Sequence, residues 1–120
     1  MRSIRNSKVL VAGILLAGCA AYPAPTEQLA ASESAIASAL RAGAIELAAD
    51  EIKSAQEKMQ LAKRWIAAKD HQPAQWLVEQ AHVDAELAEI KAMSARARKA
   101  AAQMTAELRA KNVRVARSAN

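Results

Sequence analysis

From residue 26 onwards, apolar and polar residues alternate with the period of an α-helix. The pattern is strictest between residues 52 and 66, where apolar side chains recur at alternating spacings of three and four residues. The residues of this repeat are Ile52, Ala55, Met59, Ala62 and Ile66. Before it, Leu29, Ile36 and Leu40 also lie at helical spacing. The pattern therefore predicts an all-α protein.

A second helical segment follows Pro73 and carries two neighbouring apolar stripes with heptad spacing. One stripe is Ala74, Val78, Ala81, Ala85, Ala88, Ala92 and Ala95, and the other is Val83, Leu87, Ile90, Ser94, Ala97, Ala101, Met104 and Leu108. Between the two segments, Asp70 can cap the next helix, and Pro73 falls in its first turn, where no N–H is needed. We expect a tight turn centred near His71.

Two helical arms of equal length are expected on either side of that turn. Residues 27–68 and 71–112 would each span about 63 Å as continuous helices. The predicted fold is therefore a long antiparallel helical hairpin, kinked near Gly43, in which residue i faces roughly residue 142 − i. A glycine costs only about 1 kcal/mol relative to alanine inside a helix, so it permits a kink as readily as a break. A break at Gly43 would give the alternative fold, a three-helix bundle with an overhanging last helix.

This facing rule, by which residue i lies opposite residue 142 − i, predicts specific contacts between the two arms. It places Ile52 opposite Ile90 and Met59 opposite Val83, so that apolar side chains meet. It also returns the C-terminal end of the second arm to the N-terminal end of the first.

The first 18 residues have the layout of a secretory signal peptide, with basic residues ahead of an apolar run. The basic residues are Arg2, Arg5 and Lys8. The apolar run is shorter than the roughly 20 residues that span a bilayer. It ends in Leu16-Ala17-Gly18-Cys19, which contains the only cysteine and resembles the lipobox of bacterial lipoproteins. The resemblance implies cleavage before Cys19 and attachment of lipid to the Cys19 thiol.

Lipidation at Cys19 would decide where the protein resides. A triacylated cysteine satisfies the need for more than one acyl chain in stable anchoring. In the lipoproteins that this leader resembles, an aspartate after the cysteine retains the protein at the inner membrane, and Ala20 stands there instead. We therefore expect a protein anchored by lipid in the outer membrane and facing the periplasm. Residues 19–25 would form an extended tether, because prolines disfavour helix in the residues before them.

Charge is distributed unevenly along the chain. Removal of the three leader cations lowers the formal net charge from +5 to +2, and nucleic acid is then a poor candidate partner. Residues 27–90 hold eleven acidic and six basic side chains, whereas residues 91–120 hold one acidic and eight basic ones. The predicted helical domain, residues 26–112, is therefore followed by a basic tail, residues 113–120.

The hairpin would bring this basic end back to the membrane that holds the lipid. Its cations would then lie near anionic headgroups, where each contributes about 1 kcal/mol. The side chains predicted to make this contact are Arg109, Lys111, Arg114 and Arg117.

Two stretches resemble an alanine-rich domain of bacterial envelope lipoproteins. They are Ala42-Gly43-Ala44-Ile45-Glu46-Leu47-Ala48, followed by Glu51-Ile52 with Ala55, and Glu79-Gln80-Ala81-His82-Val83-Asp84-Ala85-Glu86-Leu87-Ala88. These residues are similar to the domain of unknown function 4398, which is sometimes placed before a peptidoglycan-binding module. Family members often have a Gly-Asp-Tyr turn where this chain has Lys69-Asp70-His71. The resemblance covers about residues 27–95 and implies no established activity.

The sequence lacks the patterns that carry catalysis or metal binding. His71 in the turn and His82 in the second arm are too far apart to converge, and Glu86 lies on the face of His82. One His/Glu pair falls short of a zinc site. No serine or threonine has a His/Asp companion. We therefore expect no enzymatic activity, no metal and no cofactor.

Two functions remain for the sequence. The first is a structural or interaction module, anchored through Cys19, that binds an envelope protein or peptidoglycan partner through a helical surface. The second is a membrane-surface or lipid-handling protein whose basic C-terminal tail binds anionic headgroups. Alanine-rich faces also allow close approach of helices, so a homo-oligomer is a further expectation.

Overall fold

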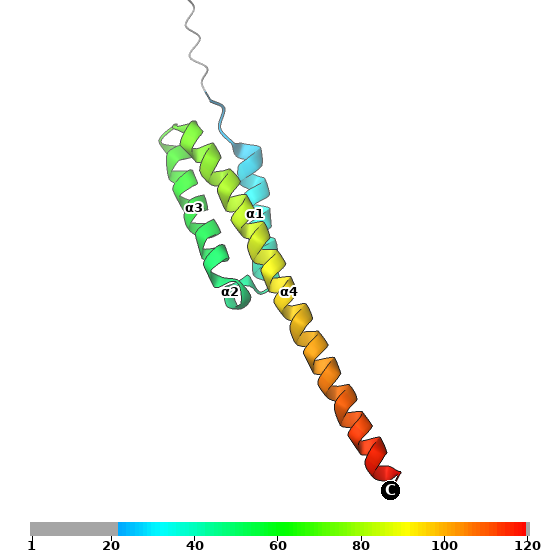
Figure 1. Cartoon of the computed structure of the whole chain (residues 1–120). Helices are drawn as coiled ribbons and strands as arrows, with labels where there is room; N and C mark the ends of the chain where they lie inside the picture. Colours follow the sequence, from blue (N-terminus) through cyan, green and yellow to red (C-terminus); the bar gives the residue numbers. More distant parts are fainter. Residues whose placement is uncertain (1–21, 120) are drawn as a thin grey trace, which may run out of the picture.

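The computed structural model describes residues 22–119, and all regular structure within them is helical. The elements are α1 (Thr26–Arg41), α2 (Ala44–Leu47), α3 (Ala49–Ala67) and α4 (His71–Ser118). Figure 1 shows α4 as a single long rod, with the shorter helices packed around its first half. The predicted all-α class is confirmed.

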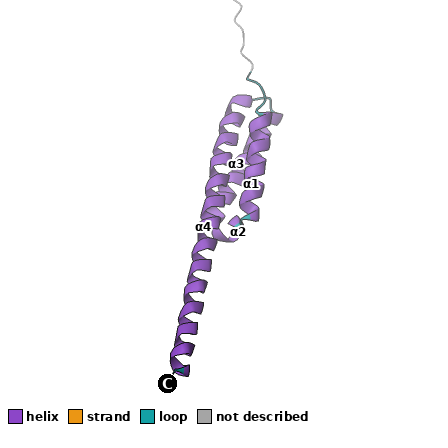
Figure 2. Ribbon diagram, turned by 90° about the vertical axis from the view of Figure 1, so that its right-hand side faces the viewer, coloured by secondary structure: helices purple, strands orange, loops and turns teal. Residues whose placement is uncertain are grey.

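The three longer helices form a bundle in which the chain reverses direction twice (Figure 2). Ser32 of α1 donates a hydrogen bond from Oγ to the carbonyl oxygen of Val78 in α4, at 3.0 Å. Lys63 of α3 forms an ion pair with Glu33 of α1, with 2.6 Å between Nζ and Oε1. Helix α1 therefore lies beside the first turns of α4 and runs parallel to it, while α3 runs antiparallel to both.

The first reversal occurs at Gly43, which ends α1 in a left-handed conformation with φ of 87°. Glycine adopts this conformation without the steric penalty that a Cβ atom brings. The N–H of Gly43 donates to the carbonyl of Leu40, which closes the end of α1. One helical turn, α2, follows, and Ala48 at φ of −151° leaves the helical region before α3 begins. Residues 43–48 therefore form a compact corner between α1 and α3.

This corner makes the predicted long hairpin wrong for residues 26–47 and confirms the alternative, a three-helix bundle with an overhanging last helix. The facing rule pairs Ile36 with residue 106, but Ile36 packs against the cluster that contains Ala88 and Ala92. The physical reason is that α1 can bury its apolar face against both α3 and α4 in the bundle. In the hairpin it would contact one helix only.

The second reversal is the turn between α3 and α4. The N–H of Asp70 donates to the carbonyl of Trp65, and the N–H of Lys69 donates to the carbonyl of Ile66, both at 3.0 Å. This pair of bonds is a Schellman motif, and it requires a left-handed residue, here Lys69 with φ of 60°. Helix α4 then begins at His71 and holds Pro73 in its first turn. The turn predicted near His71 is confirmed.

The core of the bundle is thin because most of its members are alanines. Val78 and Ser32 are the largest fully buried side chains of the described chain. The remaining buried apolar residues are Ala39, Ala42, Ala44, Ala48, Ile52, Ala55, Met59, Ala62, Ala74, Ala81, Ala85, Ala88 and Ala92. Small side chains let the helix axes approach closely. Van der Waals contact between closely packed helices therefore stabilises the bundle more than the burial of large apolar side chains does.

Helix α4 continues far beyond the bundle. Every residue from 96 to 119 is exposed. From 96 to Ser118 the overhang is about 35 Å long, at 1.5 Å per residue. Within residues 22–119, no helix combines the length and the apolar character needed to cross a membrane.

Candidate interaction surface on the long helix

Helix α4 has two apolar faces, of which one is buried and the other is exposed. The stripe that begins at Ala74 is buried against α1 and α3. We call it the buried stripe, and its buried members are Ala74, Val78, Ala81, Ala85, Ala88 and Ala92. The second stripe identified in the sequence faces solvent along its whole length. We call it the exposed stripe: Val83, Leu87, Ile90, Ser94, Ala97, Ala101, Met104 and Leu108.

The exposed stripe contains side chains that normally prefer burial. The exposed fractions are 61% for Val83, 64% for Ile90 and 66% for Met104. The predicted contacts of Ile90 with Ile52 and of Val83 with Met59 are therefore wrong. Ile52 packs instead beside Ala88 and Ala92 of the buried stripe. In the bundle, the face of α4 with the smaller side chains is buried, and the face with the larger apolar side chains is exposed.

The same spacing continues beyond both ends of the exposed stripe. Trp76 lies seven residues before Val83 and is 67% exposed, and Val115 lies seven residues after Leu108 and is 66% exposed. Polar residues, Gln80 and Lys111, occupy the intervening heptad positions. Contiguous exposed apolar surface of this kind marks an interaction site in a natural protein.

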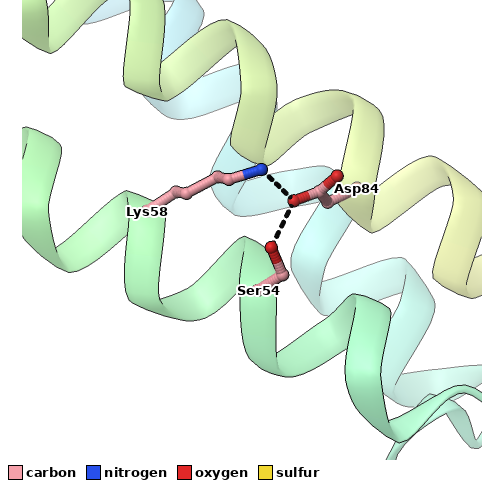
Figure 3. A network of polar contacts seen from close by, with 3 residues as sticks. All are labelled: Ser54, Lys58 and Asp84. Carbon is pink, nitrogen blue, oxygen red and sulfur yellow. Dashed lines mark hydrogen bonds and ion pairs between the residues drawn. The ribbon is translucent and has the colours of Figure 1, made fainter.

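A polar cluster holds α3 against one flank of this surface (Figure 3). Asp84 accepts hydrogen bonds through Oδ2 from Lys58 Nζ at 2.6 Å and from Ser54 Oγ at 2.7 Å. Partial burial alone would raise the pKa of the Asp84 carboxyl. The hydrogen bonds from Lys58 and Ser54, together with the Lys58 charge, outweigh burial and leave the pKa below its ordinary value of 3.8. The cluster thus fixes the register between α3 and α4.

A second ion pair fixes the same register closer to the corner. Lys91 of α4 donates a hydrogen bond to Glu51 of α3. That bond, followed by a hydrogen bond from the backbone N–H of Glu51, lowers the pKa of the Glu51 carboxyl. Both cross-helix pairs, Glu51 with Lys91 and Lys58 with Asp84, have residue numbers that add to 142. The register of the predicted facing rule is therefore confirmed for α3 and α4 through these polar pairs, although the apolar seam expected along it does not form and the rule fails for α1.

The two histidines lie apart, as the sequence predicts. His71 Nδ1 lies 2.7 Å from the carbonyl oxygen of Tyr22. His82 Nε2 lies 3.3 Å from Glu86 Oε1 one helical turn later, and its Nδ1 is buried without a hydrogen-bond partner. In the described part of the chain, no three His, Cys, Asp or Glu side chains gather closely enough to hold a metal ion. The expectation that the protein is not an enzyme stays a prediction.

The predicted membrane-contact residues occupy the far end of α4. Arg109, Lys111, Arg114 and Arg117 are all exposed on the overhang. Tyr22 lies at the opposite end of the helix, because it contacts His71. From 71 to 117 the helix spans about 69 Å. The expected return of the cations to the N-terminal end of α1 is therefore wrong, since it depended on the hairpin, while their contact with an anionic surface stays a prediction. Cys19 lies outside the described residues.

The sequence identified the residues of the exposed stripe but assigned them to contacts within the chain. One signal pointed elsewhere: the heptad spacing continues to Leu108 without a second apolar segment of matching strength between Thr26 and Gly43. The apolar stripe is therefore longer than any helix of the described chain that could cover it.

Comparison with known proteins gives one match. No curated protein and no solved structure matches the chain. The family model of a domain of unknown function, DUF4398, matches residues 27–104. These residues include the whole bundle and the first turns of the overhang. The match covers well over half of the chain, and the chain therefore belongs to the DUF4398 family.

Proposed function

We propose that this protein is a non-enzymatic, lipid-anchored module of the cell envelope that acts through the exposed stripe of α4. It is held at the periplasmic face of the outer membrane by lipid on Cys19. The stripe binds a protein partner and joins that partner to the membrane. Support comes from two independent features, the leader sequence at one end of the chain and the uncovered apolar face of α4.

The first feature concerns the anchored end. The sequence from Arg2 to Cys19 combines basic, apolar and lipobox-like segments in the order of a lipoprotein signal. Only three residue steps separate Cys19 from Tyr22, which limits the distance between them to about 11 Å. Since Tyr22 contacts His71, the lipid would lie close to the start of α4. The overhang would then project away from the anchored end.

The second feature carries the proposal. Seven large apolar side chains are exposed at heptad positions of α4, namely Trp76, Val83, Leu87, Ile90, Met104, Leu108 and Val115. Complete burial of each is worth about 1.5–3 kcal/mol. Their sum is comparable to the roughly 4–15 kcal/mol that association costs in lost translational and rotational freedom and ordering. These side chains are 42–67% exposed, so a helical partner that covers the whole stripe recovers about half of this sum and offsets part of the cost of association, whereas one that covers a short part recovers little.

Site-specific photo-crosslinking in living cells tests this role. A photoreactive amino acid at Leu108, on the stripe, should form crosslinks to protein. The same amino acid at Lys99, which is exposed on the same overhang but lies away from the stripe, is the matched control. Absence of protein crosslinks at Leu108 and at Met104 would contradict the proposal.

The anchor is tested separately by Cys19→Ser. We expect this variant to leave the membrane fraction and to lose its partition into the detergent phase, because no thiol remains to receive lipid. A Ser7→Ala change, which also lies in the leader but outside the lipobox-like motif, is the control. Unchanged partitioning of Cys19→Ser would refute anchoring at this residue.

The alternative, binding of anionic headgroups by the basic end, is a weaker proposal on this fold. The four cations lie about 69 Å along α4 from the end that carries Tyr22. They could meet the headgroups of their own membrane only if α4 lay flat on it. Replacement of Arg109, Lys111, Arg114 and Arg117 by glutamine should weaken salt-sensitive binding to anionic vesicles if this role operates.

A further inference from the structure

The positions of α4 divide into two opposed sides. Residues such as Ala81, Ala85 and Ala88 face α1 and α3, and the exposed stripe lies about 150° around the helix from them, at 100° per residue. Neither α1 nor α3 therefore obstructs a further helix that approaches the stripe. The remaining question is which helix fits there.

We propose that the exposed stripe pairs with the same stripe of a second copy of this chain, in antiparallel orientation, about a two-fold axis near Lys99. This inference rests on the proposed function, because it names the partner of the same surface. The two anchored ends then lie at opposite ends of the pair, about 84 Å apart along the helices, so the pair lies along the membrane. Residue i then faces roughly residue 198 − i of the second copy. Under this rule Ile90 faces Leu108 of the second copy, and Ala97 faces Ala101. The alanines at the centre allow the two helices to approach closely.

Charge favours the antiparallel orientation over the parallel one. Residues 27–90 carry eleven acidic and six basic side chains, and residues 91–120 carry one acidic and eight basic ones. An antiparallel pair lays the basic overhang of each copy along the acidic bundle of the other. A parallel pair would place the two basic overhangs side by side and Lys111 opposite itself within the stripe. Like charges at such short distances are destabilising, so the parallel arrangement is disfavoured.

Length supports the same orientation. The part of α4 inside the bundle, residues 71–95, and the overhang, residues 96–118, are nearly equal, at about 37 Å and 35 Å. With the axis near Lys99, residues 96–118 of one copy face residues 80–102 of the other, so the overhang covers about two thirds of the bundle segment. The overhang, whose residues are all exposed in the single chain, gains a packed face.

Flanking charges select the register. With the axis near Lys99, Glu86 lies beside Arg114 of the second copy, and symmetry makes this attractive pair twice. Glu86 is available because its side chain is 57% exposed and its one contact is with His82. A shift by one heptad would instead place Glu86 beside Glu107. The preferred register has its own cost, because Arg98 approaches its symmetry mate at the axis.

Cysteine crosslinking of the full chain, purified from membranes in detergent, tests orientation and register together. Ile90→Cys and Leu108→Cys are made singly and combined, and both positions are exposed, so the bundle should fold in every variant. The unaltered chain, whose only cysteine is Cys19, is the control. Mild oxidation should give a disulfide-linked dimer of the double variant, while each single variant gives no more dimer than the control. Crosslinking of each single variant to itself would overturn the antiparallel orientation. Failure of all variants to crosslink would overturn the homodimer.

Charge reversal provides a second measurement. Glu86→Arg alone and Arg114→Glu alone should each raise the Kd of the dimer at least tenfold in sedimentation experiments. The combined variant should return the Kd to within about threefold of the original. Equal weakening in the single and combined variants would overturn the register. If Leu108 crosslinks in cells to a different protein and the chain sediments as a monomer, the homodimer is refuted while the proposed interaction role stands.

Discussion

Replacement of Gly43 by alanine is expected to weaken the bundle and to favour the long hairpin at its expense. Gly43 is left-handed, with φ of 87°, and ends α1. An alanine in this conformation costs about 1–2 kcal/mol. The added Cβ would lie 3.7 Å from an Arg96 nitrogen and 3.7 Å from Leu47 Cδ1, which is ordinary contact. The cost therefore comes from backbone conformation and not from a clash.

The magnitude depends on which competing state is considered. Against the unfolded chain, alanine recovers about 0.4–1 kcal/mol because it has less conformational freedom to lose than glycine. The net loss of unfolding free energy is then about 1 kcal/mol. Against the hairpin, in which residue 43 is inside a continuous helix, alanine gains about 1 kcal/mol over glycine. The free-energy gap between bundle and hairpin therefore narrows by about 2 kcal/mol.

Two assays measure these two quantities. Thermal unfolding followed by circular dichroism should show a Tm lower by about 4–8 °C, as expected for a loss of 1 kcal/mol in a domain of this size. Spin labels at Glu27 and Lys111 report the competition. Glu27 lies near residue 73 in the bundle, so the two labels should be roughly 57 Å apart along α4. In the hairpin they would be neighbours.

The control is Gly43→Asn, because asparagine tolerates the left-handed conformation better than alanine and should lose less stability. We expect Gly43→Ala to add a minor population with a short distance between the labels while the long distance persists. If Gly43→Ala is as stable as the original chain and its distances are unchanged, the backbone at Gly43 does not decide the fold and the reasoning is refuted.

Two further substitutions test the α3–α4 connection. Lys69→Gly should stabilise the bundle by about 1 kcal/mol in denaturant unfolding, since Lys69 is left-handed with φ of 60°; Lys69→Ala is the control and should give no gain. The lowered pKa of Asp84 means that its ionised form stabilises the fold at pH values above the ordinary value of 3.8, and that this stability is lost as the pH falls through the lowered value. Asp84→Asn should therefore lower the unfolding free energy by about 1 kcal/mol at pH 7 and by less at pH 3; an equal loss at both pH values would contradict the role of the charge.

The sequence predicted the α3–α4 pair well because its signals were local. Pro73 and the turn before it fixed the reversal, and the strict repeat from Ile52 fixed the face of α3. The cross-helix pair of Lys58 with Asp84 then follows from the register. Nothing comparable constrained α1. One glycine changes helix energy by about 1 kcal/mol, which is smaller than the packing terms that decide whether α1 folds back.

For the candidate surface, the sequence predicted which residues share a face of α4 but not whether that face is buried. Periodicity shows which residues share a face of a helix, but it does not show what covers that face. Both stripes of α4 have heptad spacing, and from the sequence either one could be predicted to pack against the first arm of the hairpin. In the bundle, close approach selects the alanines, because Ala81, Ala85 and Ala88 let α1 and α3 approach α4. The bulkier Leu87 and Ile90 are left outside.

The lengths of the helices explain why α1 and α3 leave the second half of α4 uncovered. Helices α1 and α3 contain 16 and 19 residues, so they extend about 24 Å and 29 Å along α4, which extends about 72 Å. They occupy two sides of its first half and cannot reach the stripe or the overhang. A helix that covered both would have to come from outside the chain and extend beyond the bundle, as in the proposed dimer. Within this molecule, α4 itself is the helix with that length, an apolar stripe of matching spacing and the opposite charge at its far end.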